Sequence, residues 1–171
     1  MKKGKIVLWT VIALLLVVFT GFLMLRPWKY RVLPVLSDYD ISYGMKPEQV
    51  CRRLGDWTKR EESTIWPGTS YSFSANLFDI PADIQLDFYE DRELTSVLIF
   101  WKCEDILQAQ HLRDAIEKIF QSHFEENQGF SREQKDDQTI TFCIKYDGAT
   151  GQYYKLRVQD DFVSIYGINQ E

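Results

Sequence analysis

The chain has 171 residues, and its charges are unevenly distributed along it. All 25 acidic residues, but only 14 of the 20 basic residues, lie at or after Asp38, which gives this part of the chain a net charge of −11. Nucleic-acid binding needs a basic face for phosphate contacts, so this charge excludes a nucleic-acid partner. An acidic domain can instead steer a basic protein partner.

Residues 6–25, IVLWTVIALLLVVFTGFLML, form an apolar run without a single charge. A helix needs about 20 such residues to cross a hydrocarbon core of about 30 Å. The run therefore predicts a transmembrane anchor. A cleaved signal peptide is the alternative, but the run is longer than a signal peptide's apolar region and ends without a small-x-small cleavage site.

The flanks of this run carry similar numbers of basic residues, so the positive-inside rule does not decide its orientation. Three lysines precede it and three basic residues follow it: Lys2, Lys3, Lys5, Arg26, Lys29 and Arg31. A short basic tail before a first apolar segment usually stays in the cytoplasm. We therefore expect residues 1–25 to be a cytoplasmic tail and anchor at a bacterial cell membrane, with the rest of the chain outside the cytoplasm.

A first helix is expected over residues 48–54, after a proline-containing linker over residues 26–40. Pro47 suits the first helical position, because the N–H that it lacks would be unpaired there. Gly55 is a natural residue just after a helix end. Three side chains at helical spacing are expected to face the core: Val50, Cys51 and Leu54.

Strand patterns follow this helix. Residues 70–77 and 84–88 alternate between polar and apolar side chains, which is typical of strands with one buried face. Residues 94–101 are apolar on both faces, which predicts a central strand.

A second helix is expected over about residues 104–124, with an apolar stripe that includes His123. After a polar loop, three further strands are expected over residues 139–146, 153–158 and 162–168, joined by turn sequences.

The order of elements predicts an α+β fold. An N-terminal transmembrane helix is followed by tandem helix-plus-three-strand units, in a domain over residues 41–171. The half-repeats, about 41–101 and 104–168, share no obvious sequence identity, and each is marginal in size for an independent core. We therefore expect them to form one antiparallel sheet with both helices packed on one face.

The cysteines number three: Cys51, Cys103 and Cys143. An extracytoplasmic domain could hold one disulfide and one free thiol, but the spacing names no pair. Buried small hydrophobic residues are the default interpretation for Cys51 and Cys143. The sequence has no CxxC motif and no cluster of cysteines and histidines, so no metal site is expected.

No catalytic motif was found. The sequence lacks a P-loop and the GxSxG, HExxH and GxGxxG patterns. His111 and His123 are twelve positions apart on the second helix, over three turns, so they cannot share a metal ion. We expect no catalytic residue, no cofactor and no enzymatic activity.

Residues 43–55, YGMKPEQVCRRLG, resemble the opening motif of small bacterial envelope proteins of the outer-membrane assembly lipoprotein type (SmpA/OmlA) and of β-lactamase-inhibitor-like domains. The hairpin at residues 86–97 resembles their second strand, turn and third strand. The resemblance covers about residues 41–101. It implies a helix followed by antiparallel strands, and a function in binding proteins. The resemblance and the residue patterns both indicate a structural role for the motif residues, which are Gly44, Met45, Val50, Leu54 and Gly55.

Together these patterns predict a membrane-anchored extracytoplasmic protein-binding module of the bacterial envelope. Two alternatives stay open: an inhibitor or immunity protein against a hydrolase or toxin, and an unrecognised enzyme. The expected partners are the membrane, through residues 6–25, and a protein of unknown identity.

Overall fold

A computed structural model describes residues 33–170, with gaps at 56–58, 63–66, 128 and 146–150. The described residues belong to one compact unit, Val32–Glu171. The expected anchor at residues 6–25 lies outside the described residues. Within the described part of the chain, no helix is both long and apolar enough to cross a membrane.

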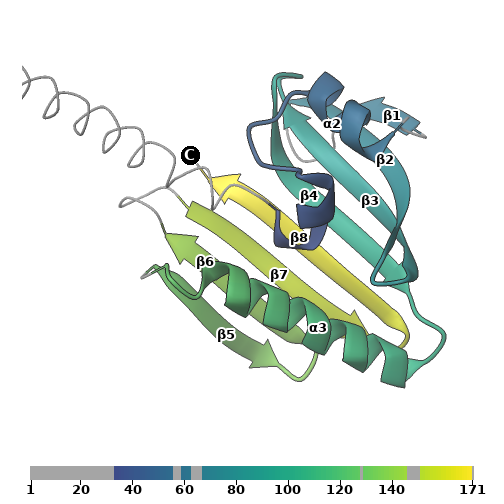
Figure 1. The fold of residues 1–171 in the computed structure, drawn as a ribbon, viewed down its shortest axis with the longest axis vertical. Coiled ribbons are helices and arrows are strands. Elements are labelled where there is room, and N and C mark those ends of the chain that lie inside the picture. Colours follow the sequence, from purple (N-terminus) through teal and green to yellow (C-terminus); the bar gives the residue numbers. More distant parts are fainter. Residues whose placement is uncertain (1–32, 56–58, 63–66, 128, 146–150, 171) are drawn as a thin grey trace, which may run out of the picture. The chain divides into compact units, whose positions relative to one another are not determined.

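The strands form a single eight-stranded antiparallel sheet in the order β1-β2-β3-β4-β8-β7-β6-β5 (Figure 1). Their bounds are Lys59–Glu62 (β1), Gly68–Leu77 (β2), Ile80–Tyr89 (β3), Glu93–Lys102 (β4), Phe130–Asp136 (β5), Thr139–Lys145 (β6), Gly151–Gln159 (β7) and Phe162–Gln170 (β8). Each half of the domain supplies four consecutive strands. The last strands of the two halves, β4 and β8, pair at the centre.

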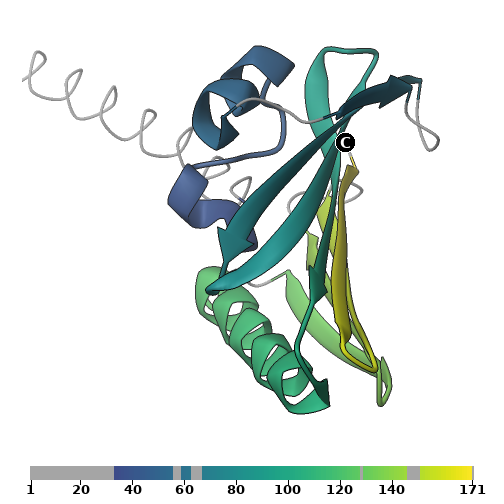
Figure 2. The same cartoon turned by 90° about the vertical axis from the view of Figure 1, so that its right-hand side faces the viewer.

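The helices lie on one face of this sheet (Figure 2). They are the 3-10 helix η1, Pro34–Tyr39, and the α-helices α2, Pro47–Leu54, and α3, Ile106–Phe124. Helix α3 contacts η1, β7 and β8. Among the described residues, no helix covers the opposite face of the sheet (Figure 2).

Local sequence signals explain where the two α-helices begin. In α2, the backbone N–H of Lys46 donates a 2.9 Å hydrogen bond to Oε1 of Gln49, and Pro47 occupies the first turn. In α3, Oδ1 of Asp105 accepts a 2.8 Å hydrogen bond from the backbone N–H of Gln108. Such caps satisfy N–H groups that have no partner within the helix.

An aromatic cluster holds α3 on the second half of the sheet. The ring of Phe120 stacks on Phe142 of β6 with centroids 4.7 Å apart, and its edge meets Tyr154 of β7 at 4.7 Å. Phe124 stacks on Phe130 of β5 at 5.7 Å. Burial of such large rings dominates core energetics, so this cluster fixes the helix against strands β5 to β7.

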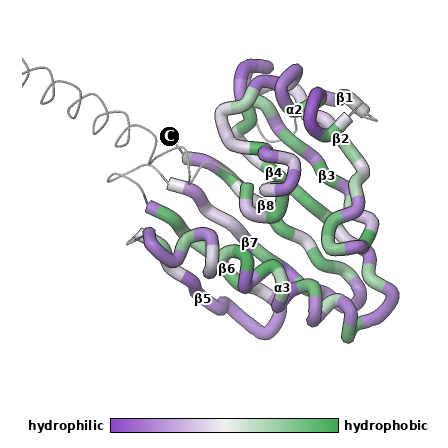
Figure 3. Tube along the Cα trace, in the orientation of Figure 1, coloured by the Kyte–Doolittle hydropathy of each residue, from purple (hydrophilic) through white to green (hydrophobic). Residues whose placement is uncertain are grey.

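The predicted fold class is wrong. Instead of an N-terminal transmembrane helix followed by helix-plus-three-strand units, the described residues form one eight-stranded sheet, and none of their helices could cross a membrane. Each half also has an edge strand that was not predicted: β1 in the first half, and β5 in the second, where a polar loop was expected. Strand β5 is exposed along nearly its whole length and mostly hydrophilic (Figure 3). An edge strand that buries neither face gives no hydrophobic alternation to detect.

The domain also begins earlier than residue 41. Leu33, Val35 and Leu36 are buried, although a linker is expected at residues 26–40. The backbone N–H of Leu33 donates a 2.9 Å hydrogen bond to the carbonyl oxygen of Ile41. Apolar side chains in this short segment pack against α3, so the segment from residue 33 belongs to the core.

Candidate protein-binding face

The side of the sheet that faces away from the helices is called the open face. Side chains alternate along a strand, so every second residue points to this face. The other phase is buried under the helices: Ile84, Ile99 and Ile165 are at most 1% exposed. The open face therefore presents the intervening residues of β3, β4, β8 and β7.

Aromatic and aliphatic side chains occupy the open face of the two central strands, β4 and β8, toward the end where Lys102 pairs with Phe162. Phe100 of β4 is 45% exposed and Phe162 of β8 is 48% exposed, although both strands are central in the sheet. Leu98 and Tyr166 are half-buried and lie opposite each other in the register. Exposed apolar side chains gathered on one surface mark interaction sites.

The ammonium of Lys102 lies 5.8 Å from the ring centroid of Phe162, in a cation–π contact across β4 and β8. Among the described residues, neither Lys102, Lys155 nor Arg157 forms an ion pair with a carboxylate. Three cations thus lie beside the aromatic centre of a domain that is acidic overall.

Acidic and basic side chains lie on opposite sides of this centre. One row of the register reads Asp83, Phe100, Ser164 and Arg157, across β3, β4, β8 and β7. Three strand spacings of about 4.8 Å separate the two charged ends by about 14 Å, too far for an ion pair within the sheet. Within the central strands, the exposed carboxylate of Asp83 therefore lies on β3 and the cations of Lys155 and Arg157 lie on β7. Lys102 lies on β4, and beyond β7 the row continues through Thr139 to a second carboxylate, Asp136 of the edge strand β5.

A hydrogen-bonded carboxylate lies on the β3 side. Asp87 is 1% exposed, and its Oδ2 accepts a 2.6 Å hydrogen bond from the hydroxyl of Ser96. Its Oδ1 accepts from the hydroxyl of Ser70 and, at 3.2 Å, from Nε2 of Gln85. A buried carboxylate with three donors is well satisfied. This cluster ties β2, β3 and β4 together beneath the rest of the face.

The phenol of Tyr166 is affected by the same carboxylate. Burial raises the pKa of Tyr166, and the negative charge of Asp87 raises it further. Both effects disfavour the phenolate, so Tyr166 presents a neutral hydroxyl to the open face.

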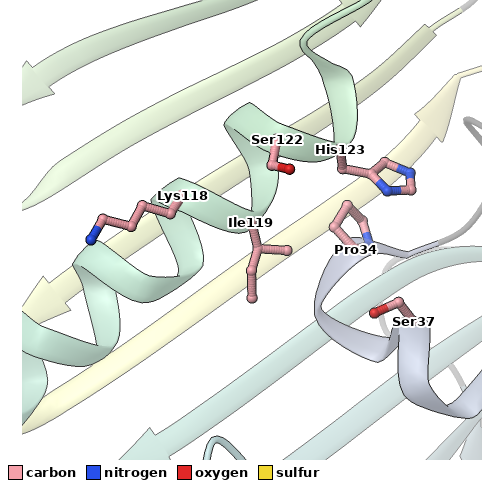
Figure 4. A pocket seen from close by; sticks show the side chains of 6 residues that line it. All are labelled: Pro34, Ser37, Lys118, Ile119, Ser122 and His123. Atoms are coloured by element: carbon pink, nitrogen blue, oxygen red, sulfur yellow. The ribbon is translucent and has the colours of Figure 1, made fainter.

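Two clefts lined by described residues lie on the helical side of the sheet, and neither has catalytic character. The first, of about 360 Å³, lies between η1 and α3 and is lined by Pro34, Ser37, Lys118, Ile119, Ser122 and His123. Figure 4 shows His123 beside Pro34, with the ammonium of Lys118 pointing away. The second, of about 290 Å³, is lined by Phe78, Asp79, Ile80, Gln108, His111, Leu112 and Ala115.

Neither lining combines a nucleophile, a base and a carboxylate that could orient the base. In the described part of the chain, the first cleft has no carboxylate and the second has no hydroxyl or thiol. The two histidines line different clefts. No group of three or more His, Cys, Asp or Glu among the described residues could hold a metal ion.

The motif residues predicted from the sequence lie away from the open face. Gly44 has a φ of 81° and its N–H donates to the carbonyl of Leu94 at 3.0 Å, which joins the start of the domain to β4. Val50 is fully buried, whereas Met45 and Leu54 are only half-buried. Gly55 has a φ of 87° after α2.

The three cysteines are free thiols in this structure. Cys103 is buried, and Cys51 and Cys143 are half-buried. Burial raises the pKa of the Cys103 thiol, and the carboxylates of Asp161 and Asp105 raise it further. Since the thiolate is the reactive form, burial and these carboxylates make Cys103 poorly suited to nucleophilic chemistry.

Sequence reasoning missed the open face. The signal was present at residues 94–101, where Leu98 and Phe100 occupy the strand phase that is polar in β2. This pattern predicts a central strand, which β4 is, but it does not show that helices cover only one face of the sheet among the described residues.

Comparisons of the chain with family models, with curated proteins and with solved structures found no match. The resemblance of residues 41–101 to SmpA/OmlA and β-lactamase-inhibitor-like domains therefore stays a prediction.

Proposed function

We propose that this protein is a non-enzymatic protein-binding module, and that its open face is the binding surface. The observation that carries the proposal is the exposure of Phe100 and Phe162 on the central strands of the sheet. Protein interfaces are enriched in aromatic side chains at their core and surround them with polar side chains. The charged residues that flank this centre supply such a rim.

The proposed location is the outer side of a bacterial cell membrane, with attachment through residues 6–25. The support is the sequence alone: an uncharged run of membrane-spanning length preceded by a short basic tail. A module held in this way meets partners in or near the envelope.

An inhibitor or immunity protein against a hydrolase or toxin is the second candidate. It is favoured by the net charge of −11 at and after Asp38, which suits a basic target. Protection of a host strain from one defined toxin or hydrolase, lost on substitution of Phe100, is the result that would favour it over a general binding module.

Site-specific photocrosslinking tests the proposed function. The photoreactive phenylalanine analogue p-benzoylphenylalanine replaces Phe100 in the full chain, and cells are irradiated. We expect a protein adduct from this position. The matched control replaces Gln110, an exposed residue of α3 on the opposite side of the sheet, and should give no adduct. Absence of any adduct at Phe100 would contradict the proposal.

A further inference from the structure

We propose that the open face binds the open face of a second copy of this chain, about a two-fold axis that runs parallel to the strands between β4 and β8. This inference rests on the proposed function, because it names the partner of the same surface. It is carried by the placement of Asp83 on β3 and of Lys155 and Arg157 on β7, which makes the central strands of the face complementary to themselves.

Rotation about this axis places β3 of one copy over β7 of the other. In the row that contains both charged ends, Asp83 then lies opposite Arg157 of the second copy, and the reverse pair forms at the same time. An isologous interface requires this reciprocity. Arg157 forms no ion pair among the described residues, although its charge acts on Asp136 of β5, and in the dimer it gains a carboxylate partner.

The centre of the face is complementary under the same rotation. Leu98 lies opposite Tyr166 of the second copy, because these two residues are partners across β4 and β8 in the register. Lys102 lies opposite Phe162 of the second copy for the same reason, so a cation–π contact forms between copies as well as within each. Stacked twisted sheets cross at about 30°, so these pairs near the axis meet most closely.

A two-fold axis perpendicular to the strands does not give this complementarity. It places β3 over β3 and β7 over β7, so that Asp83 approaches the acidic β3 of the other copy, and Lys155 approaches its own counterpart. Like charges that face each other across an interface weaken association. The charge pattern therefore selects the axis along the strands.

The size of the face also fits a dimer. Strands β2, β3, β4, β8, β7 and β6 contain between 7 and 10 residues each. With strands about 4.8 Å apart and about 3.4 Å per residue, this part of the face covers about 900 Å². The row of Asp87, Ser96 and Ile168 is already buried and does not add to the available area. A specific interface buries about 800 Å² on each partner.

The mass of the photocrosslinked adduct at Phe100 tests the partner's identity. We expect an adduct of twice the 20.2 kDa mass of the chain, with a differently tagged second copy present in it. An adduct with a different protein and no dimer overturns self-pairing and leaves the proposed function standing. No adduct at all overturns both.

Charge reversal tests the geometry. Arg157→Glu should lower the yield of dimer adduct by about tenfold, because the carboxylate introduced in each copy would oppose Asp83 of the other. The double variant Asp83→Arg with Arg157→Glu exchanges the two charges in every copy and should restore the yield to within about twofold of the unmodified chain. If the partner were a different protein, this exchange would not restore the adduct yield, because the charges of that protein would be unchanged.

Lys118→Glu is the matched control, because it makes the same charge change at an exposed position of α3 and should leave the yield unchanged. Asp83 and Arg157 are exposed, so the variants are expected to fold, and their amounts in the membrane fraction report this directly. A yield that Arg157→Glu does not lower, or that the double variant does not restore, overturns the proposed pairing.

Discussion

The hydroxyl of Ser96 donates a 2.6 Å hydrogen bond to Oδ2 of Asp87, across the neighbouring strands β4 and β3. Ser70 of β2 donates to the other carboxylate oxygen, so one buried side chain connects three strands. The cluster lies at the edge of the proposed binding surface, on the same face as Leu98. It therefore supports the surface without belonging to its exposed centre.

Loss of this carboxylate should destabilise the domain. Asp87→Ala leaves the buried hydroxyls of Ser70 and Ser96 without their acceptor, and each such loss costs about 1–3 kcal/mol. We expect the free energy of unfolding of residues 33–171 to fall by about 2 kcal/mol or more, measured by urea denaturation. Asp83→Ala, on the same strand but exposed, should change it by less than about 0.5 kcal/mol. Equal changes in the free energy of unfolding for the two substitutions would show that the hydrogen bonds of Asp87 do not stabilise the domain.

The N-terminal boundary of the folded unit gives a second prediction. Leu36 is fully buried in η1, so Leu36→Ala should cost about 2–5 kcal/mol. Asp38→Ala, two positions away and exposed, is the control and should be nearly neutral. Urea midpoints of the fragment 33–171 measure both. If Leu36→Ala left the urea midpoint unchanged, residues 33–40 would be a linker and not part of the folded core.

The sequence predicted individual elements better than their arrangement. The strand expected at residues 94–101 is β4, Glu93–Lys102, and the helix expected to end at Phe124 is α3. Both carry periodic apolar side chains that are buried against the core, and such periodicity is the strongest signal in a sequence. The elements that were not predicted are those in which the burial of side chains does not follow a periodic pattern in the sequence.

Two segments show this mismatch between side-chain burial and sequence periodicity. Strand β5 pairs along the sheet edge through backbone hydrogen bonds while its side chains stay in solvent, so its residues look like a loop. Leu33 and Leu36 have the opposite property, because they are buried from a segment too short to show any period. The strand that contains Phe100 is central, as expected, but its sequence does not show that Phe100 is exposed, since apolar side chains that bind a partner and those that fill a core look alike in a sequence.

The raised pKa of Tyr166 predicts how stability changes at alkaline pH. The folded state holds the phenol proton more tightly than the unfolded state, so the associated stability is fully present below the unfolded pKa of about 10. It is lost as the pH rises through the folded pKa. Because burial and Asp87 cause the shift, Tyr166→Phe should lose less stability than the unmodified domain over this range.

Two measurements check this prediction. Urea denaturation at a series of alkaline pH values gives the stability difference between the two proteins. Phenolate absorbance, compared between the unmodified domain and Tyr166→Phe, should isolate one tyrosine that ionises above the ordinary range. If the difference spectrum instead appeared at the pH of an exposed tyrosine, neither burial nor Asp87 would be acting on this group.

The glycine at the start of β2 gives the sharpest test of backbone geometry. Gly68 has a φ of 145°, which other residues rarely adopt. A Cβ at this position would overlap the carbonyl oxygen of Phe88 and lie 2.9 Å from the amide nitrogen of Glu90, and both of these atoms belong to the backbone. Gly55 also has a positive φ, of 87°, but a Cβ there would meet no atom within 4 Å.

The two glycines therefore separate conformational strain from steric overlap. Gly55→Ala should cost about 1–2 kcal/mol from strain alone. Gly68→Ala should cost clearly more, because β2 must also move away from β3, which displaces the pairing of Gly68 with Tyr89. Urea denaturation of the fragment 33–171 gives both values. Were Gly55→Ala the more damaging change, the close approach of β2 and β3 at Gly68 would not be a constraint on the fold, and the sheet edge next to β1 would be looser than its register indicates.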